Sequence, residues 1–183
     1  MRNSSGKGSK AVSVVLFAVV AMGALGTMAA SNSGAVDQSW PTAESPIFNG
    51  LPRDVVTEVL ANPRAQDNVR ILPADATVQR DALWQGMVIN FVQCRQLLAI
   101  YQTWQETDNA PELPPLVLPS LQGSSVVKDA TIIDGFYRSE VASGDIAKLR
   151  ADLTNESGCG PWIPANPGDV AGPTIADVVT SGN

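Results

Sequence analysis

The stretch from Thr77 to Thr107 constrains the fold of this chain more than any other segment. Between Asp81 and Glu106 its only charged residue is Arg95. Apolar residues recur there at alternating spacings of three and four, which indicates one face of an α-helix. That face consists of Trp84, Met87, Phe91, Cys94, Leu98 and Tyr101. Further apolar residues widen it around most of the circumference, so we expect a central helix that other segments cover on several sides.

A transmembrane helix is the alternative interpretation of the same stretch, because about 20 apolar residues can cross a bilayer. Polar side chains interrupt the stretch too often for that role. They are Gln85, Asn90, Gln93, Arg95 and Gln96. We therefore assign residues 77–107 to the core of a helical domain.

Shorter helices are expected on both sides of the long one. A proline at the first helical position and a stripe of valines indicate a helix over 52–62. Capping residues and apolar stripes indicate two more helices, over 124–142 and 145–158, and a last short turn over 173–179. No convincing strand pattern occurs. The sequence therefore predicts an all-α fold, a small bundle of three to four helices around the central helix.

The connections between these helices are rich in charge and proline. Asn62 precedes a proline and is expected to end the first helix, and residues 64–74 are expected to be a charged loop. Four prolines fall within residues 111–119, which favours an extended strap over 108–119. The leucine and valine side chains of this strap are too apolar for a free linker, so we expect it to lie across the helices.

Residues 1–35 have the pattern of an export signal. Basic residues precede an uncharged apolar run over 11–30, and small residues follow it. We favour cleavage after Ala30 or Ala35, with a retained single-pass membrane anchor through 11–30 as the alternative. In both cases the remainder lies outside the cytoplasm, secreted or in the cell envelope, because the positive end of such a segment stays inside.

The rest of the chain divides into three parts by composition. A polar, turn-rich linker covers 36–51, a single helical domain covers 52–160, and a proline- and glycine-rich extension covers 161–183. The helical domain is long enough to bury a core of its own.

The two cysteines, Cys94 and Cys159, are expected to form a structural disulfide, because an exported chain meets an oxidising environment. The closed loop of about 66 residues corresponds to about 4 kcal/mol in the chain-entropy model. A redox role is the alternative, since Cys159-Gly160-Pro161-Trp162 overlaps a dithiol motif. Trp162 replaces the second cysteine of that motif, so dithiol exchange lacks its resolving thiol.

Composition excludes several kinds of chemistry. The chain has no histidine, which removes the usual general base and the histidine ligands of metals and haem. Removing residues 1–30 takes three of the 12 basic residues and none of the 18 acidic ones, so the remainder has a net charge near −9. It contains no basic cluster, and we expect no nucleic-acid partner, no metal and no cofactor.

Paired carboxylates are the remaining candidates for catalysis. Asp134 with Glu140, or Asp54 with Glu58, are the pairs considered for acid–base chemistry in a cleft. Helical periodicity places Asp54 and Glu58 on a solvent-facing side, and Arg138 stands four residues after Asp134 as an ion-pair partner. We expect a solvated acidic face, and a carboxylate hydrolase is only the third functional hypothesis.

Aromatic residues are candidates for either the core or a binding surface. An apolar docking face would consist of Trp84, Phe91, Tyr101, Trp104 and Trp162. Our leading hypothesis is an exported, non-catalytic protein that acts by binding another protein. A carrier for a lipid or other small apolar ligand is the alternative, suggested by the surplus of large apolar residues on the central helix.

Overall fold

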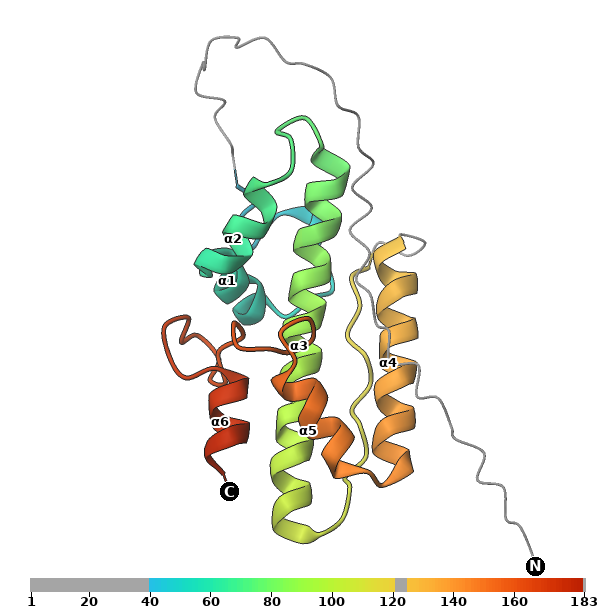
Figure 1. Ribbon diagram of the computed structural model, residues 1–183. Helices are drawn as coiled ribbons and strands as arrows, with labels where there is room; N and C mark the ends of the chain where they lie inside the picture. The colour runs from blue at the N-terminus through green and yellow to red at the C-terminus, as the bar shows by residue number, and fades with distance from the viewer. Residues whose placement is uncertain (1–39, 121–124, 183) are drawn as a thin grey trace, which may run out of the picture. The chain divides into compact units, whose positions relative to one another are not determined.

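Helix α3 (Thr77–Thr107) is the longest element, and its bounds are those predicted. The structure is a computed structural model, and it describes residues 40–120 and 125–182. Buried side chains occur along α3 from Trp84 to Trp104. Several of the other helices contact α3 along its length (Figure 1), so α3 is the central helix that its apolar circumference predicts.

The surrounding elements are short helices. They are the 3-10 turn η1 (Pro46–Phe48), α1 (Arg53–Ala61), α2 (Pro63–Arg70), α4 (Ser125–Ser143), α5 (Ile146–Thr154) and α6 (Ile175–Ser181). Helix α3 contacts α1, α2, α4, α5 and η1. Within the described residues no strand forms, and the all-α prediction is confirmed. Asp145 caps α5, its side chain accepting a hydrogen bond from the backbone N–H of Lys148.

Helix α2 occupies residues 64–70 of the charged loop predicted for residues 64–74. The side chain of Asn62 accepts hydrogen bonds from the backbone N–H groups of Arg64 (3.0 Å) and Ala65 (3.3 Å), and Pro63 occupies the first turn. Asparagine at a helix N-cap followed by proline is a strong start signal. The Asn62-Pro63 pair therefore ends α1 and begins α2, and the prediction of a loop was wrong.

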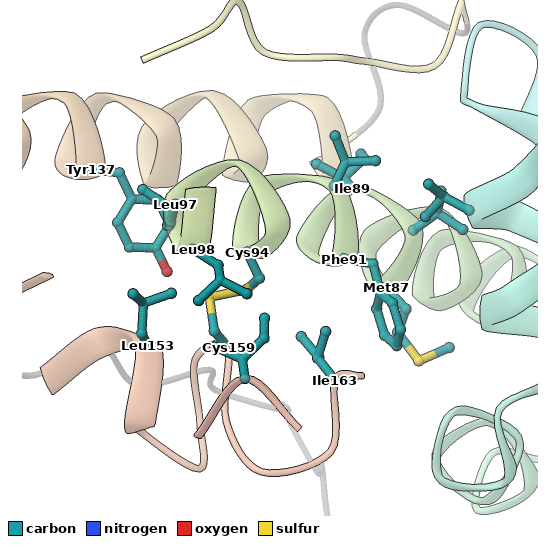
Figure 2. Close-up of a cluster of buried hydrophobic side chains, with 14 of the residues drawn as sticks. Met87, Ile89, Phe91, Cys94, Leu97, Leu98, Tyr137, Leu153, Cys159 and Ile163 are labelled. Carbon is teal, nitrogen blue, oxygen red and sulfur yellow. A yellow bond between two sulfur atoms is a disulfide. The ribbon is translucent and has the colours of Figure 1, made fainter. Parts of the chain in front are cut away.

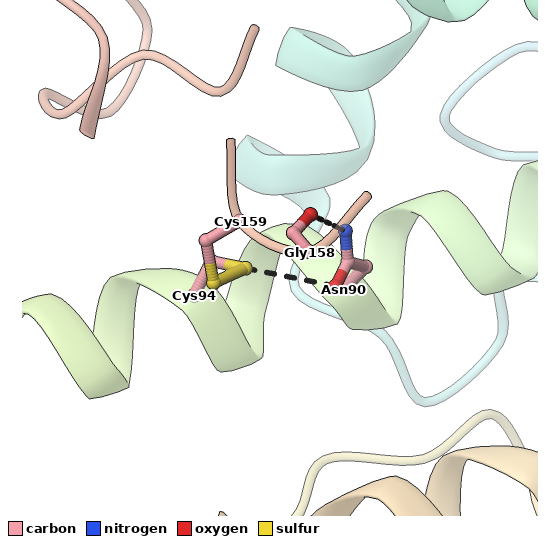
Figure 3. The surroundings of a disulfide bond; sticks show 4 residues. All are labelled: Asn90, Cys94, Gly158 and Cys159. Carbon is pink, nitrogen blue, oxygen red and sulfur yellow. Dashed lines mark hydrogen bonds between the residues drawn. A yellow bond between two sulfur atoms is a disulfide. The ribbon is translucent and has the colours of Figure 1, made fainter. Parts of the chain in front are cut away.

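The predicted disulfide is confirmed. Cys94 on α3 and Cys159 after α5 are joined, with Cα atoms 5.3 Å apart. Both cysteines are fully buried. Beside the bond, Asn90 donates a hydrogen bond from Nδ2 to the carbonyl of Gly158 at 3.5 Å (Figure 3). These two links attach the segment after α5 to the middle of α3.

The residues after Gly160 supply side chains to the same core. Ile163 and Ile175 are fully buried. The backbone N–H of Ile175 donates to the carbonyl of Ile163 at 2.9 Å, which closes the loop between them. In Figure 2, Leu153 and Ile163 lie on either side of the disulfide and beside side chains of α3. The proline- and glycine-rich extension is thus packed against the helices over its described part.

The segments assigned to export and linkage are described only in part. The export signal predicted for 1–35 lies outside the described residues. In the linker predicted for 36–51, Phe48 is buried, and Gln85 donates a hydrogen bond to the carbonyl of Ile47 at 2.6 Å. No helix in the described part of the chain is both long and apolar enough to cross a membrane.

Candidate functional site

The proline-rich strap that follows α3 forms one wall of the candidate site. Figure 1 shows it returning from the end of α3 toward α4. Arg138 of α4 holds the strap: its Nη1 donates to the carbonyl of Leu113 at 2.9 Å, and its Nη2 to that of Pro114 at 2.6 Å. At the far end, the backbone N–H of Ser120 donates to the carbonyl of Asn49 at 2.7 Å. The strap is therefore held at its middle by Arg138 and at its far end by Asn49.

A groove of about 680 Å³ lies between α3, the strap and the end of α4. Its apolar side chains are those of Trp104, Leu113 and Val141, which are at most 8% exposed. The remaining lining residues are Asp108, Asn109, Ala110, Pro111, Glu112, Arg138, Ala142 and Gly144. The groove is open to solvent and has both apolar and polar walls, so it differs from the enclosed, mainly apolar cavity typical of a lipid site.

The carboxyl ends of two helices meet at this groove. Helix α3 ends at Thr107, and the N–H of Asp108 donates to the carbonyl of Trp104 at 2.9 Å. Helix α4 ends at Ser143, beside Ala142 and Gly144 of the lining. Neither helix has a basic residue in its last turn. The negative ends of both helix dipoles thus remain without a neighbouring cation from their own helices.

The five aromatic residues proposed as a docking face do not form one surface. Trp84, Phe91 and Tyr101 are at most 3% exposed. Trp84 packs edge-on against Trp40 with ring centroids 5.6 Å apart, and Phe91 does so against Trp162 at 5.3 Å. Of the five, only Trp104 lines the groove. Trp84, Phe91 and Tyr101 belong to the core, and the half-buried Trp162 packs against it, which is the alternative that the sequence left open.

Glu58 was predicted to face solvent and does not. Its residue is 3% exposed, and its Oε1 accepts a hydrogen bond from Nη2 of Arg95 on α3. Its Oε2 accepts the backbone N–H of Gly168 at 2.9 Å. Glu58 therefore connects α1, α3 and the loop before α6, and the placement of Asp54 and Glu58 on one solvated side was wrong.

Asp134 and Glu140 do not converge on one site. Asp134 accepts hydrogen bonds from Arg138, at 2.7 Å from Nε, as predicted. Glu140 instead faces Asp152 of α5. Burial and then the hydrogen bond with Asp152 raise the pKa of Glu140 to about 8. Oε2 of Glu140 and Oδ2 of Asp152 are buried without a hydrogen-bond partner in the described structure.

This carboxyl pair lies outside the lining of the groove. Burial, followed by the charges of Asp152 and Glu140, raises the pKa of Tyr137 to about 12, so its hydroxyl stays neutral. Among residues 40–120 and 125–182, no group of three or more acidic or cysteine side chains is placed to hold a metal ion.

Comparison with known proteins finds no match. No family model, no curated protein and no solved structure matches this chain.

Proposed function

We propose that this protein is an exported, non-catalytic binding protein that holds a segment of a partner protein in the groove between α3, the strap and α4. The groove carries this proposal. Its volume of about 680 Å³ is within the range of ligand sites, and its walls are formed by segments that Arg138 fixes in place. A groove that exists before binding lowers the ordering cost of association.

The groove favours a protein segment over a small apolar ligand. A carrier must remove most of an apolar ligand from water, which an open groove with a polar rim does poorly. A polypeptide has both apolar side chains and backbone groups, so it can pair with both kinds of wall. The alternative is that the protein carries a lipid. A lipid carrier needs an enclosed cavity, and this groove is open.

Export is supported by the N-terminal sequence and by the disulfide. Basic residues followed by an apolar run are typical of export signals, and disulfides persist mainly in oxidising compartments. The protein would act after secretion or in the cell envelope, with an uncleaved anchor through residues 11–30 as the alternative. Intact mass measurement of the protein recovered from its native cells distinguishes cleavage from retention.

A blocking variant tests the binding function. Ala142 is exposed at the rim of the groove, so Ala142→Trp fills the groove without removing a core side chain. Ala147→Trp is the matched control, because Ala147 is an exposed helical alanine outside the lining. Crosslinking in native cells should recover one partner with the wild type and Ala147→Trp, and lose it with Ala142→Trp. Equal recovery with all three proteins would refute the proposal.

A further inference from the structure

We infer that the partner segment is cationic and partly apolar: a lysine or arginine side chain flanked by apolar residues. This inference rests on the proposed function and names the chemistry of the partner. Three features of the groove support this inference. They are its exposed acidic residues, the helix ends beside them, and the fact that its one basic lining residue already binds other groups of the protein.

The rim of the groove carries unpaired negative charge. Asp108 and Glu112 are exposed and line the groove, and neither takes part in an ion pair within the described structure. The carbonyl ends of α3 and α4 add partial negative charge at the same place. The two acids and the two helix ends therefore border the same groove.

The single basic residue of the lining does not offset this charge. Arg138 donates from Nε and Nη2 to Asp134, and from Nη1 and Nη2 to the carbonyls of the strap. Its charge is matched by Asp134, and its donors are directed at the wall of the groove. Nearby Lys148 pairs with Asp145 at 3.6 Å. An anionic segment would therefore meet repulsion at the rim and find no free guanidinium.

The floor of the groove requires an apolar component. Trp104, Leu113 and Val141 offer aliphatic and aromatic contact. A lysine or arginine side chain combines a hydrocarbon stem with a charged end, so it can cover the floor while its charge reaches the rim. Neighbouring apolar residues of the partner would complete the contact. The net charge of the chain outside residues 1–30 is near −9, which also favours a positively charged partner.

Fluorescence anisotropy with defined peptides tests the inference on the purified full-length protein. The probes are three fluorescein-labelled peptides in which leucine alternates with lysine, glutamine or glutamate. We expect the lysine peptide to bind about tenfold more tightly than the glutamine peptide and the glutamate peptide to bind more weakly still. Added salt should reduce the difference between the three peptides.

Charge-neutral variants locate the effect. Asp108→Asn with Glu112→Gln should weaken lysine-peptide binding about tenfold and leave glutamine-peptide binding unchanged. Asp129→Asn with Glu156→Gln is the matched control, because it removes two exposed acids outside the groove and alters the net charge equally. An equal loss in the control would overturn the inference, since the attraction would then be general.

The outcomes separate the chemistry of the partner from the binding function. If the glutamine or glutamate peptide binds as tightly as the lysine peptide and Ala142→Trp abolishes both, the cationic partner is wrong and the groove function stands. If Ala142→Trp leaves lysine-peptide binding unchanged, the peptide binds elsewhere and the inference about the groove is wrong. Failure of the proposed function itself would appear in the crosslinking experiment with native cells.

Discussion

Glu58 on α1 and Arg95 on α3 form an ion pair in the interior of the protein, although 36 residues separate them in the sequence. The Arg95 side chain is 13% exposed and that of Glu58 is 1% exposed. Arg95 also lies over the ring of Phe91, with its guanidinium carbon 5.9 Å from the ring centroid. Nε and Nη1 of Arg95 are buried without a hydrogen-bond partner in the described structure. Glu58 is therefore the main group that stabilises the buried charge of Arg95.

Replacing Glu58 should therefore destabilise the fold strongly. We expect Glu58→Ala to lower the free energy of unfolding by about 3–5 kcal/mol, because the Arg95 charge would remain buried without an anion. Denaturant unfolding measures the loss. Asp54→Ala, on an exposed position of the same helix, should cost less than about 1 kcal/mol. Equal losses in the two variants would contradict a stabilising role for the buried pair.

Reduction of the Cys94–Cys159 bond should lower stability by about 4 kcal/mol in the chain-entropy model. The cause is the release of a loop of about 66 residues in the unfolded chain. Denaturant midpoints with and without a reducing agent give the difference. The double variant Cys94→Ala with Cys159→Ala should have the lowered stability in both conditions and be insensitive to the reductant. A reductant effect in that variant would point to another cause, because the chain has no further cysteine.

The carboxyl pair of α4 and α5 should make stability depend on pH. The pKa of Glu140 is raised from its ordinary value of 4.5 to about 8, so the folded state binds more protons than the unfolded state between those values. The contribution of Glu140 to stability should therefore be greatest below about pH 4.5 and should be lost as the pH rises through about 8. Unfolding at pH 6 and pH 9 measures the decrease.

Glu140→Gln should remove much of this decrease and make the protein more stable than the wild type at pH 9. The amide stays neutral and can still donate a hydrogen bond to Asp152. Glu156→Gln is the control, since Glu156 is exposed and outside the pair. If both variants keep the pH dependence of the wild type, Glu140 does not cause it.

Gly160, next to the disulfide, should not tolerate a side chain. Its φ is +40°, and an added Cβ would lie 2.8 Å from the carbonyl oxygen of Asn155. Gly160→Ala should cost about 2–4 kcal/mol, from backbone strain and from this clash. Gly144→Ala measures the backbone strain alone, because Gly144 has a φ of +72° with open space around it. Thermal unfolding should rank Gly160→Ala below Gly144→Ala, and the reverse order would rule out the clash.

Local sequence patterns predicted the extent of α3 because a long apolar repeat leaves few alternatives. They missed α2, whose segment is mostly polar and buries only Ala65 and Val69. Its start was nonetheless encoded in Asn62 and Pro63, which we interpreted only as an end. A helix boundary of this kind is local, and capping preference could have identified it.

The site was less predictable because it depends on contacts between distant residues. The partner of Glu58 is on another helix, and no periodicity within α1 indicates it. Arg95, the only charge in the central part of α3, was a usable signal, because a charge on a buried helix requires a partner. The groove was not predicted at all, since its shape depends on where Arg138 holds the strap.

The disulfide has a consequence for the fate of the chain under proteolysis. Cys94 and Cys159 enclose the strap, all of α4 and all of α5. A protease that cuts any one peptide bond between the two cysteines releases no fragment, since both halves stay joined through sulfur. On a non-reducing gel such a nicked molecule would migrate as a single species and separate into two only after reduction. Outside a cell, one cleavage in the exposed part of the strap would therefore leave the groove-forming segments covalently together.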